Sequence, residues 1–239
     1  MKWQFDTLSF ESDVFGAPVG RVVPCHGGGD DLNALVRAWQ TQGQWLVSAR
    51  IASSDKRAAL NLFANGFEPI ETLLTLERDI SPSAQMPQNA RLVGEGDRNA
   101  CLAIARSAFS YDRFHADTRV PNEAADRLKE TWVANSLAGR ADAVLVVDIE
   151  GQLGGFVTCM SDGDAAVIDL IAVAPDFQGQ GLGKILIQGV LGHYAGCKIK
   201  LRVGTQDTNL HSLTLYKGQG FDRAKSQVSY HWMREGHSS

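Results

Sequence analysis

Residues 168–187 read IDLIAVAPDFQGQGLGKILI, an apolar strand-like run, then a glycine-rich loop, then a helix-like run. Three of the six residues from 178 to 183 are glycines. The start of a helix offers about four free N–H groups and roughly half a positive charge. Glycines allow positive φ and let a ligand approach the backbone without meeting a Cβ atom. The stretch therefore predicts a main-chain cradle for a phosphate or diphosphate.

Two common phosphate loops do not fit this stretch. A Walker loop needs Ser or Thr after Gly-Lys, whereas Ile185 follows Lys184 here. A dinucleotide-binding fingerprint has different glycine spacing and needs an acidic residue about 20 residues later, where this chain is basic.

Outward from the loop, the C-terminal part alternates helix and strand patterns. Strands are expected at residues 143–149, 154–160, 166–173, 199–203 and 226–233, and helices at 97–109, 123–137, 184–195 and 208–219. Mixed strands with helices on both sides predict an α/β fold with a central mixed sheet flanked by helices.

The N-terminal part is shorter, with strand patterns at 20–24 and 45–51 around a helix pattern at 32–43. A polar stretch with two prolines at 79–90 suggests a boundary, so we expect domains at 1–80 and 90–239 joined by a linker at 81–89. Both parts contain a helix end, Gly-Phe and a strand. Matched on these pairs, Gly66 falls on Gly220 and Leu62 on Tyr216, which suggests a partial duplication.

Composition narrows the class of protein. The 239 residues are 44% hydrophobic and 21% charged, with a net charge of −4. This balance and the lack of a long basic cluster predict a soluble protein without nucleic-acid partners. The four cysteines are widely spaced, so we expect reduced thiols, mostly buried, and no metal site. No apolar run reaches about 18 residues, and no signal core opens the chain, so no membrane partner and a cytoplasmic location are expected.

Two motifs in order resemble the GNAT (GCN5-related N-acetyltransferase) superfamily. Gln178, Gly181 and Gly183 match its acetyl-CoA signature, Q/R-x-x-G-x-G/A. About 25 to 30 residues later this superfamily carries N-x-x-(small)-x-x-x-Y-x-x-x-G-F, and residues 209–221 match every fixed place. The resemblance implies a GNAT fold for the C-terminal domain, preceded by a smaller, incomplete GNAT-like N-terminal domain.

The resemblance also implies roles for the matched positions. The strand would hold the pantetheine arm and offer one N–H to the thioester carbonyl, the loop would hold the diphosphate of acetyl-CoA, and Tyr216 would protonate the departing thiolate. The implied cofactor-binding residues are Leu170, Ile171, Ala172, Val173, Gln178, Gly179, Gln180, Gly181, Leu182, Gly183, Lys184, Asn209, Ser212 and Tyr216.

The acceptor amine must lose a proton, so a base or a water chain is needed. Asp169, on the strand that leads to the loop, is the first candidate; His115, Asp162 and Asp164 are others. No motif marks any of them.

Acceptor sites of the superfamily lie near the first two helices and their connection, which here hold Arg and aromatic residues suited to phosphate contacts and ring stacking. The expected substrate-binding residues are Tyr111, Arg113, Phe114, His115, Arg119, Trp132 and Asn135. The order F-x-x-x-R-F, Pro and W-x-x-N-x-x-x-G resembles the TDP-fucosamine acetyltransferases, as does LSFESDVFG at residues 8–16. That resemblance implies a nucleotide-linked amino-dideoxy sugar as the acceptor, for polysaccharide biosynthesis.

Other readings remain open at this stage. The acceptor could be a peptide N-terminus, a polyamine or an antibiotic, although a polyamine site would carry more acids. A non-catalytic CoA-binding module is the alternative from another class, and the presence of Tyr216 beside a complete cradle argues against it. A homodimer is also left open.

Overall fold

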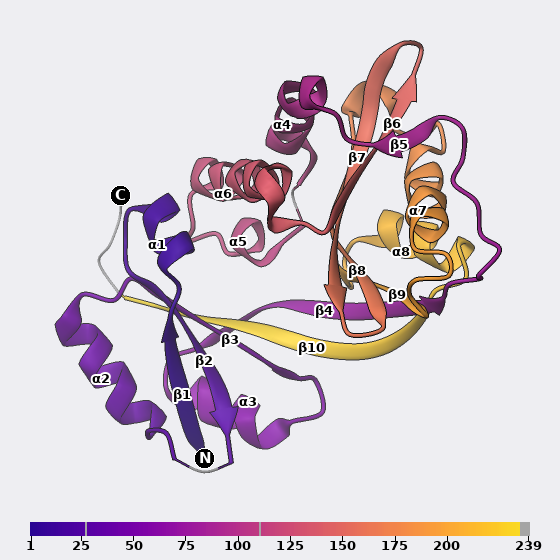
Figure 1. The fold of residues 1–239 in the computed structure, drawn as a ribbon. Helices are drawn as coiled ribbons and strands as arrows, with labels where there is room; N and C mark the ends of the chain where they lie inside the picture. Colours follow the sequence, from indigo (N-terminus) through magenta and orange to yellow (C-terminus); the bar gives the residue numbers. More distant parts are fainter. Residues whose placement is uncertain (27, 110, 235–239) are drawn as a thin grey trace. The chain divides into compact units, whose positions relative to one another are not determined.

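Two units, each with its own buried core, make up the computed structural model, which describes residues 1–26, 28–109 and 111–234 (Figure 1). Unit 1 contains Met1–Leu73, Asp112–Ala124 and the C-terminal residues from Lys225 onward. Unit 2 contains Leu74–Tyr111 and Ala125–Ala224. The chain therefore enters unit 1 three times, and the segment of residues 112–124, called the inserted segment below, belongs to unit 1 although its flanks belong to unit 2.

Unit 1 is built on strands in the order β1-β2-β3-β10-β4. Its elements are β1 (Lys2–Thr7), α1 (Ser9–Phe15), β2 (Val19–Cys25), α2 (Leu32–Gln42), β3 (Leu46–Ala52), α3 (Lys56–Ala64), the first half of β4 (Glu68–Asp79), α5 (Arg113–Ala116) and most of β10 (Asp222–Met233). Helices α2 and α3 cover one face, where Trp3, Trp39, Leu62 and Trp232 form a core.

Unit 2 has strands in the order β4-β9-β8-β7-β6-β5. Its elements are β5 (Ala90–Leu92), α4 (Arg98–Ala108), α6 (Asn122–Asn135, which begins in unit 1), β6 (Ala143–Ile149), β7 (Gln152–Asp162), β8 (Ala165–Val173), α7 (Leu182–His193), β9 (Lys200–Gln206) and α8 (Leu210–Gly218). Short helical turns lie at Glu95–Asp97, Ser136–Arg140 and Pro175–Phe177.

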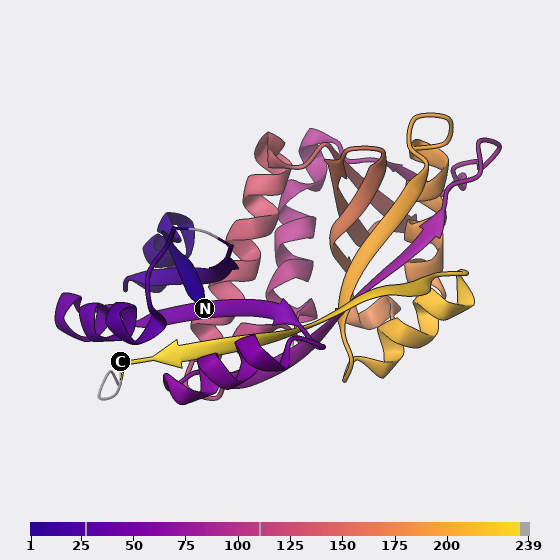
Figure 2. The same cartoon turned by 90° about the horizontal axis from the view of Figure 1, so that it is seen from below.

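Alternating side chains of the unit 2 strands feed two cores. Leu170 and Ala172 of β8 pack with α4 and α6, which lie side by side in Figure 2 and are joined by an ion pair of Arg106 with Glu130. The opposite face packs against α7 and α8. Because successive strand residues point to opposite faces, one strand can serve both layers.

The predicted α/β class with a mixed sheet and flanking helices is confirmed, since β6 to β8 pair antiparallel and β8 pairs parallel with β9. The expected helix at residue 184 begins earlier, at Leu182, because Gly181 takes a left-handed conformation (φ 81°) and caps it. The domain boundaries at 80 and 90 stay a prediction; the two units change over inside β4, after Leu73.

Three further expectations can be compared with the structure. Gly66 and Gly220 both have positive φ (81° and 77°) where a helix turns into β4 or β10, so the two joints share a local geometry. All four cysteines are free, but only Cys101 and Cys159 are buried, so the expectation that most are buried is wrong. Within the described residues, the helices are too short or too polar to span a bilayer.

Candidate active site

Strands β8 and β9 stop pairing with each other before they reach the glycine loop. Their parallel pairing runs from Ala165 with Lys200 to Ile168 with Val203 and ends there. β8 continues to Val173 and β9 to Gln206. The last five residues of β8 therefore present to that side a backbone edge on which an extended ligand can form strand-like hydrogen bonds.

A bulge sets which amides of β8 face this open edge. Thr158 of β7 pairs with Leu170 and the next residue, Cys159, pairs with Ile168, so Asp169 is the extra residue. The Leu170 N–H points toward β7 and donates to Thr158 Oγ1 at 3.1 Å. Because amides alternate along a strand, the N–H groups of Ile171 and Val173 point to the open edge.

The glycine loop joins the end of β8 to α7. Outside the helices and strands of the described residues, the backbone N–H groups of residues 179–183 donate no hydrogen bond. The next two amides, of Lys184 and Ile185, both donate to the Gly181 carbonyl. Gly179 and Gly181 have positive φ (76° and 81°), and a Cβ built on either would meet nothing within 4 Å. The loop thus combines free amides, a helix N-terminus and open space, which suits a diphosphate.

Not every predicted cradle residue can contact a ligand in the same way. Leu182 is 3% exposed and belongs to the core, so only its amide is available. A Cβ on Gly183 would lie 2.9 Å from Leu215 Cδ2, so this glycine permits close approach of α7 and α8. Lys184, Gln178 and Gln180 are exposed.

Helix α8 brings Asn209, Ser212 and Tyr216 together, as their spacing predicts. Asn209 caps the helix, and its Oδ1 accepts from the Ser212 amide at 3.1 Å. The cap therefore uses one lone pair of the Asn209 oxygen, which leaves the second lone pair and the NH₂ group for a ligand. Tyr216 is 2% exposed, and its ring packs 5.5 Å from that of Phe221.

Burial raises the pKa of the Tyr216 phenol above its ordinary value. Tyr216 also lies in the last turn of α8, where the helix dipole disfavours a phenolate. The phenol therefore stays protonated at neutral pH, and it can protonate a thiolate only if burial raises the proton affinity of that thiolate too.

Asp169, the bulged residue, is held by Arg140. Arg140 Nη1 donates to Asp169 Oδ2 at 2.8 Å and to Ser136 Oγ at 3.2 Å. The turn that follows α6 is thereby tied to the bulge of β8, at the strand segment with the open edge. Arg140 and Thr158 escaped sequence reasoning because no local spacing links either residue to the bulge.

The other acidic candidates lie elsewhere. Asp162 ends β7, Asp164 precedes β8, and Asp162 accepts an ion pair from Arg202 at 3.1 Å. Both lie before the first residue of β8, so the length of that strand, about 25 Å, separates them from the glycine loop. The structure does not bring them to the cradle.

The predicted acceptor residues divide between the two units. In unit 2, Tyr111 is 49% exposed. The ammonium nitrogen of the buried Lys129 lies 4.4 Å from the centre of the Trp132 ring on α6. Asn135 is the last residue of α6, next to the turn that contacts Asp169 through Arg140.

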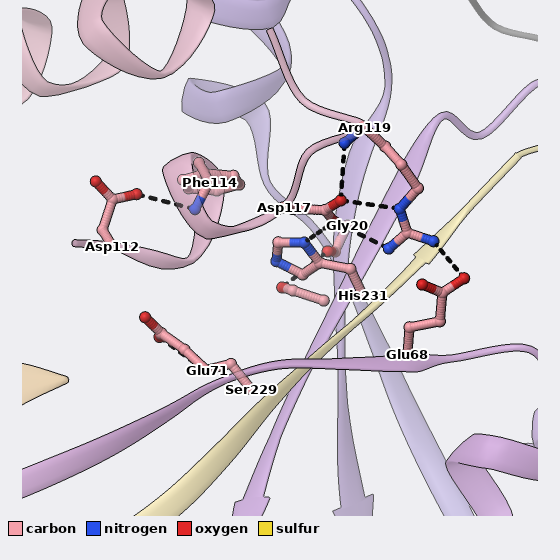
Figure 3. Close-up of polar contacts among 10 residues, drawn as sticks. Gly20, Glu68, Glu71, Asp112, Phe114, Asp117, Arg119, Ser229 and His231 are labelled. Atoms are coloured by element: carbon pink, nitrogen blue, oxygen red, sulfur yellow. Dashed lines mark hydrogen bonds and ion pairs between the residues drawn. The ribbon is translucent and has the colours of Figure 1, made fainter. Parts of the chain in front are cut away.

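In unit 1, the inserted segment holds the remaining four, of which Figure 3 labels Phe114 and Arg119. The Arg113 guanidinium lies 4.5 Å from the centre of the Phe114 ring. His115 Nδ1 contacts Asp112 Oδ2 at 2.6 Å, and Arg119 pairs with Asp117 and Glu68, both at 2.8 Å. The side chains of His115 and Arg119 therefore belong to ion pairs or hydrogen bonds within unit 1, and the Arg113 guanidinium lies against the Phe114 ring. Among the described residues, no group of three or more His, Cys, Asp or Glu side chains is arranged to hold a metal ion.

Comparison with known proteins identifies the C-terminal part. Residues 111–221 match the acetyltransferase (GNAT) family. This part of the chain is therefore similar to GNAT acetyltransferases. Its α7 loop, β8 and α8 all fall within the matched residues.

Curated proteins similar to this chain extend the comparison. The spore coat polysaccharide biosynthesis protein SpsD of Bacillus subtilis is 30% identical over 57% of this chain and 47% of its own length. Mycothiol acetyltransferase of Stackebrandtia nassauensis is 28% identical over 79% of this chain and 69% of its own. The chain thus spans about half the length of SpsD.

A solved structure supports the fold over nearly the whole chain. The GCN5-related N-acetyltransferase of Sphaerobacter thermophilus superposes with a TM-score of 0.67, at 17% identity, over 97% of this chain and 76% of its own. The expected GNAT fold is therefore confirmed, while the incomplete GNAT-like N-terminal domain stays a prediction.

Proposed function

We propose that this protein is an acetyl-CoA-dependent N-acetyltransferase whose acceptor is the amine of a nucleotide-linked amino sugar. The single observation that carries the transferase activity is the open edge of β8 beside the amides of residues 179–183, for which the described part of the chain shows no acceptor outside its helices and strands. The pantetheine arm of acetyl-CoA can extend along the edge of β8 like a neighbouring strand. The diphosphate at the end of that arm would then lie at the glycine loop, which follows β8 in the chain.

In this proposal the amides of residues 179–183 and the Lys184 ammonium bind the diphosphate. The N–H of Ile171 or Val173 donates to the thioester oxygen and stabilises the oxyanion that forms on attack. Leu170 is left out of this role because its amide already donates to Thr158. The NH₂ group of Asn209 binds the pantetheine or acetyl region.

The transfer itself is a direct displacement. The neutral amine nitrogen attacks the thioester carbon, the C–N bond forms, and the C–S bond breaks as the tetrahedral intermediate collapses. The Tyr216 phenol gives its proton to the leaving thiolate, and the amine gives a proton to a base. We propose Asp169, through a water molecule, as that base, since its carboxylate is held at the bulge by Arg140.

The nucleotide-sugar acceptor is supported by the resemblance of the acceptor segment to the TDP-fucosamine acetyltransferases and by the relative named for spore coat polysaccharide biosynthesis. A mycothiol-type acceptor is the second candidate, because relatives named mycothiol acetyltransferase match more of the chain, up to 97%.

A thiol-release assay with acetyl-CoA tests the proposal. The acceptor panel contains nucleotide-linked amino sugars, the same sugars without the nucleotide, unacetylated mycothiol, a peptide with a free N-terminus, a polyamine and an aminoglycoside antibiotic. We expect the highest kcat/KM with a nucleotide-linked amino sugar. A higher value for unacetylated mycothiol would replace the acceptor, and acetyl-CoA binding without thiol release on any acceptor would favour a non-catalytic module.

A further inference from the structure

One face of the unit 1 sheet is polar and buried. His231 of β10 lies opposite Ser48 of β3, and Ser229 lies opposite Arg50, so these four side chains share a face. Ser48, Ser229 and His231 are 6%, 1% and 0% exposed. The neighbouring residues point to the other face, where Tyr230 and Trp232 join the core with α2 and α3. Burying polar groups costs free energy unless they are bonded, so their bonding partners are informative.

Asp117 of the inserted segment supplies the central partner (Figure 3). Its Oδ2 contacts His231 Nδ1 at 2.8 Å and Arg119 Nη2 at 2.9 Å, and its Oδ1 accepts from Arg119 Nε at 2.8 Å. The Arg119 amide also donates to Oδ1, at 3.1 Å. The Asp117 side chain is 2% exposed, so these bonds are shielded from water.

The charges agree with this bonding. Burial alone would raise the pKa of the Asp117 carboxyl, but the bonds from His231 and Arg119 outweigh burial and hold it below its ordinary value. Burial lowers the pKa of His231 below its ordinary value, although Asp117 opposes the shift. At neutral pH, Asp117 is therefore a carboxylate and His231 a neutral imidazole, whose proton lies on Nδ1 because Nδ1 faces the carboxylate.

The His231 imidazole packs against Phe114, one of the residues that we expect to bind the acceptor. The His231 ring lies 5.7 Å from the Phe114 ring, and the Arg113 guanidinium lies 4.5 Å from that ring on α5. Arg113 Nε is buried and has no hydrogen-bond partner. Arg50, Glu71, Glu11 and Asp112 are its charged neighbours, and burial lowers its pKa to about 10, so it remains charged at neutral pH.

We propose that Asp117 is a positioning residue for acceptor binding: by fixing His231 and Arg119 it orients Phe114 and, through that ring, the Arg113 donor that binds an anionic oxygen of the acceptor. This inference rests on the proposed function for the assignment of the segment to the acceptor. The diphosphate or sugar oxygens of a nucleotide-linked sugar have the matching chemistry.

Steady-state kinetics with the best acceptor of the panel tests the proposal. Asp117→Asn keeps the shape but removes the charge that both partners use. We expect its KM for the acceptor to rise at least about tenfold, with the KM for acetyl-CoA within about twofold of wild type. Glu68→Gln is the matched control, because Glu68 bonds the same Arg119 guanidinium at 2.8 Å but is 64% exposed. Its acceptor KM should stay within about twofold.

Arg119→Lys is the second variant, in case Asp117→Asn fails to fold, since it keeps the charge but loses the two-point contact with Asp117. It should raise the acceptor KM in the same direction. The proposal is overturned if the folded variants change both KM values equally, or change neither.

Two measurements need no acetyl transfer. Nitrogen-15 NMR should show His231 protonated on Nδ1 and not on Nε2 at neutral pH. Amide exchange of residues 112–120 should be at least about tenfold faster in Asp117→Asn than in Glu68→Gln. Unchanged exchange or the other tautomer would overturn the positioning role. The NMR and amide-exchange results could hold while no acceptor of the panel gives thiol release. The proposed function would then fail, and the role of Asp117 in holding the inserted segment would stand.

Discussion

Replacing Gly192 with alanine would place a methyl group against the backbone of another segment. Gly192 lies near the end of α7, and a Cβ built on it would meet the Met86 nitrogen and would lie 2.5 Å from the Gln85 carbonyl carbon. These are backbone atoms, which cannot move away as a flexible side chain can. Either α7 or residues 85–86 must shift.

The magnitude follows from two opposing effects. Alanine stabilises a helix interior by about 1 kcal/mol relative to glycine. Forced overpacking costs about 1–3 kcal/mol, and occasionally more. Because the contact is with backbone at less than 3 Å, we expect the upper part of this range, hence a net loss of about 1–2 kcal/mol. For a chain of this size that lowers Tm by about 2–8 °C.

Gly218→Ala is the matched control. Gly218 is the last residue of α8, has ordinary φ, and a Cβ on it would meet nothing within 4 Å. This variant should leave Tm unchanged or raise it slightly. Scanning calorimetry of both variants beside wild type is the assay. If Gly192→Ala were as stable as Gly218→Ala, the close contact of α7 with residues 85–86 would be refuted.

Three further predictions concern the site and the buried imidazole. Gly181→Ala should weaken coenzyme A binding at least about tenfold, as measured by calorimetry. Gly151→Ala is the control, because Gly151 has a similar positive φ (77°) and equally open space; it should cost the same backbone strain of about 1–2 kcal/mol without losing affinity. Equal affinities of the two variants would place the diphosphate elsewhere. Tyr216→Phe should lower kcat about 100-fold or more with little change in the KM for acetyl-CoA, and near-normal turnover would remove Tyr216 as the general acid. The free energy of unfolding should fall as the pH drops below about 6.5, because folding lowers the pKa of His231 and the unfolded state then binds more protons. Urea titrations at several pH values should show a smaller dependence of that free energy on pH in His231→Gln. An unchanged dependence would mean that His231 does not titrate in this way.

The sequence was most informative where function depends on short-range geometry. The glycine loop, the helix that follows it and the register of Asn209, Ser212 and Tyr216 each depend on residues a few positions apart. Their backbone conformations are set by local rules, such as positive φ at Gly181 and the cap at Asn209. Periodicity likewise placed β6 at 143–149 without error.

Contacts between residues distant in the chain were decided by the tertiary structure. His231 and Asp117 are separated by 114 positions, and no local pattern links them. The parting of β8 from β9, the bulge at Asp169 and its pairing with Arg140 arise from strand register and packing. Sequence alone therefore predicted which residues cradle a diphosphate and which residue donates a proton. Only the folded chain decided which amides stay free and which buried charges meet, because both depend on which groups pairing has already used.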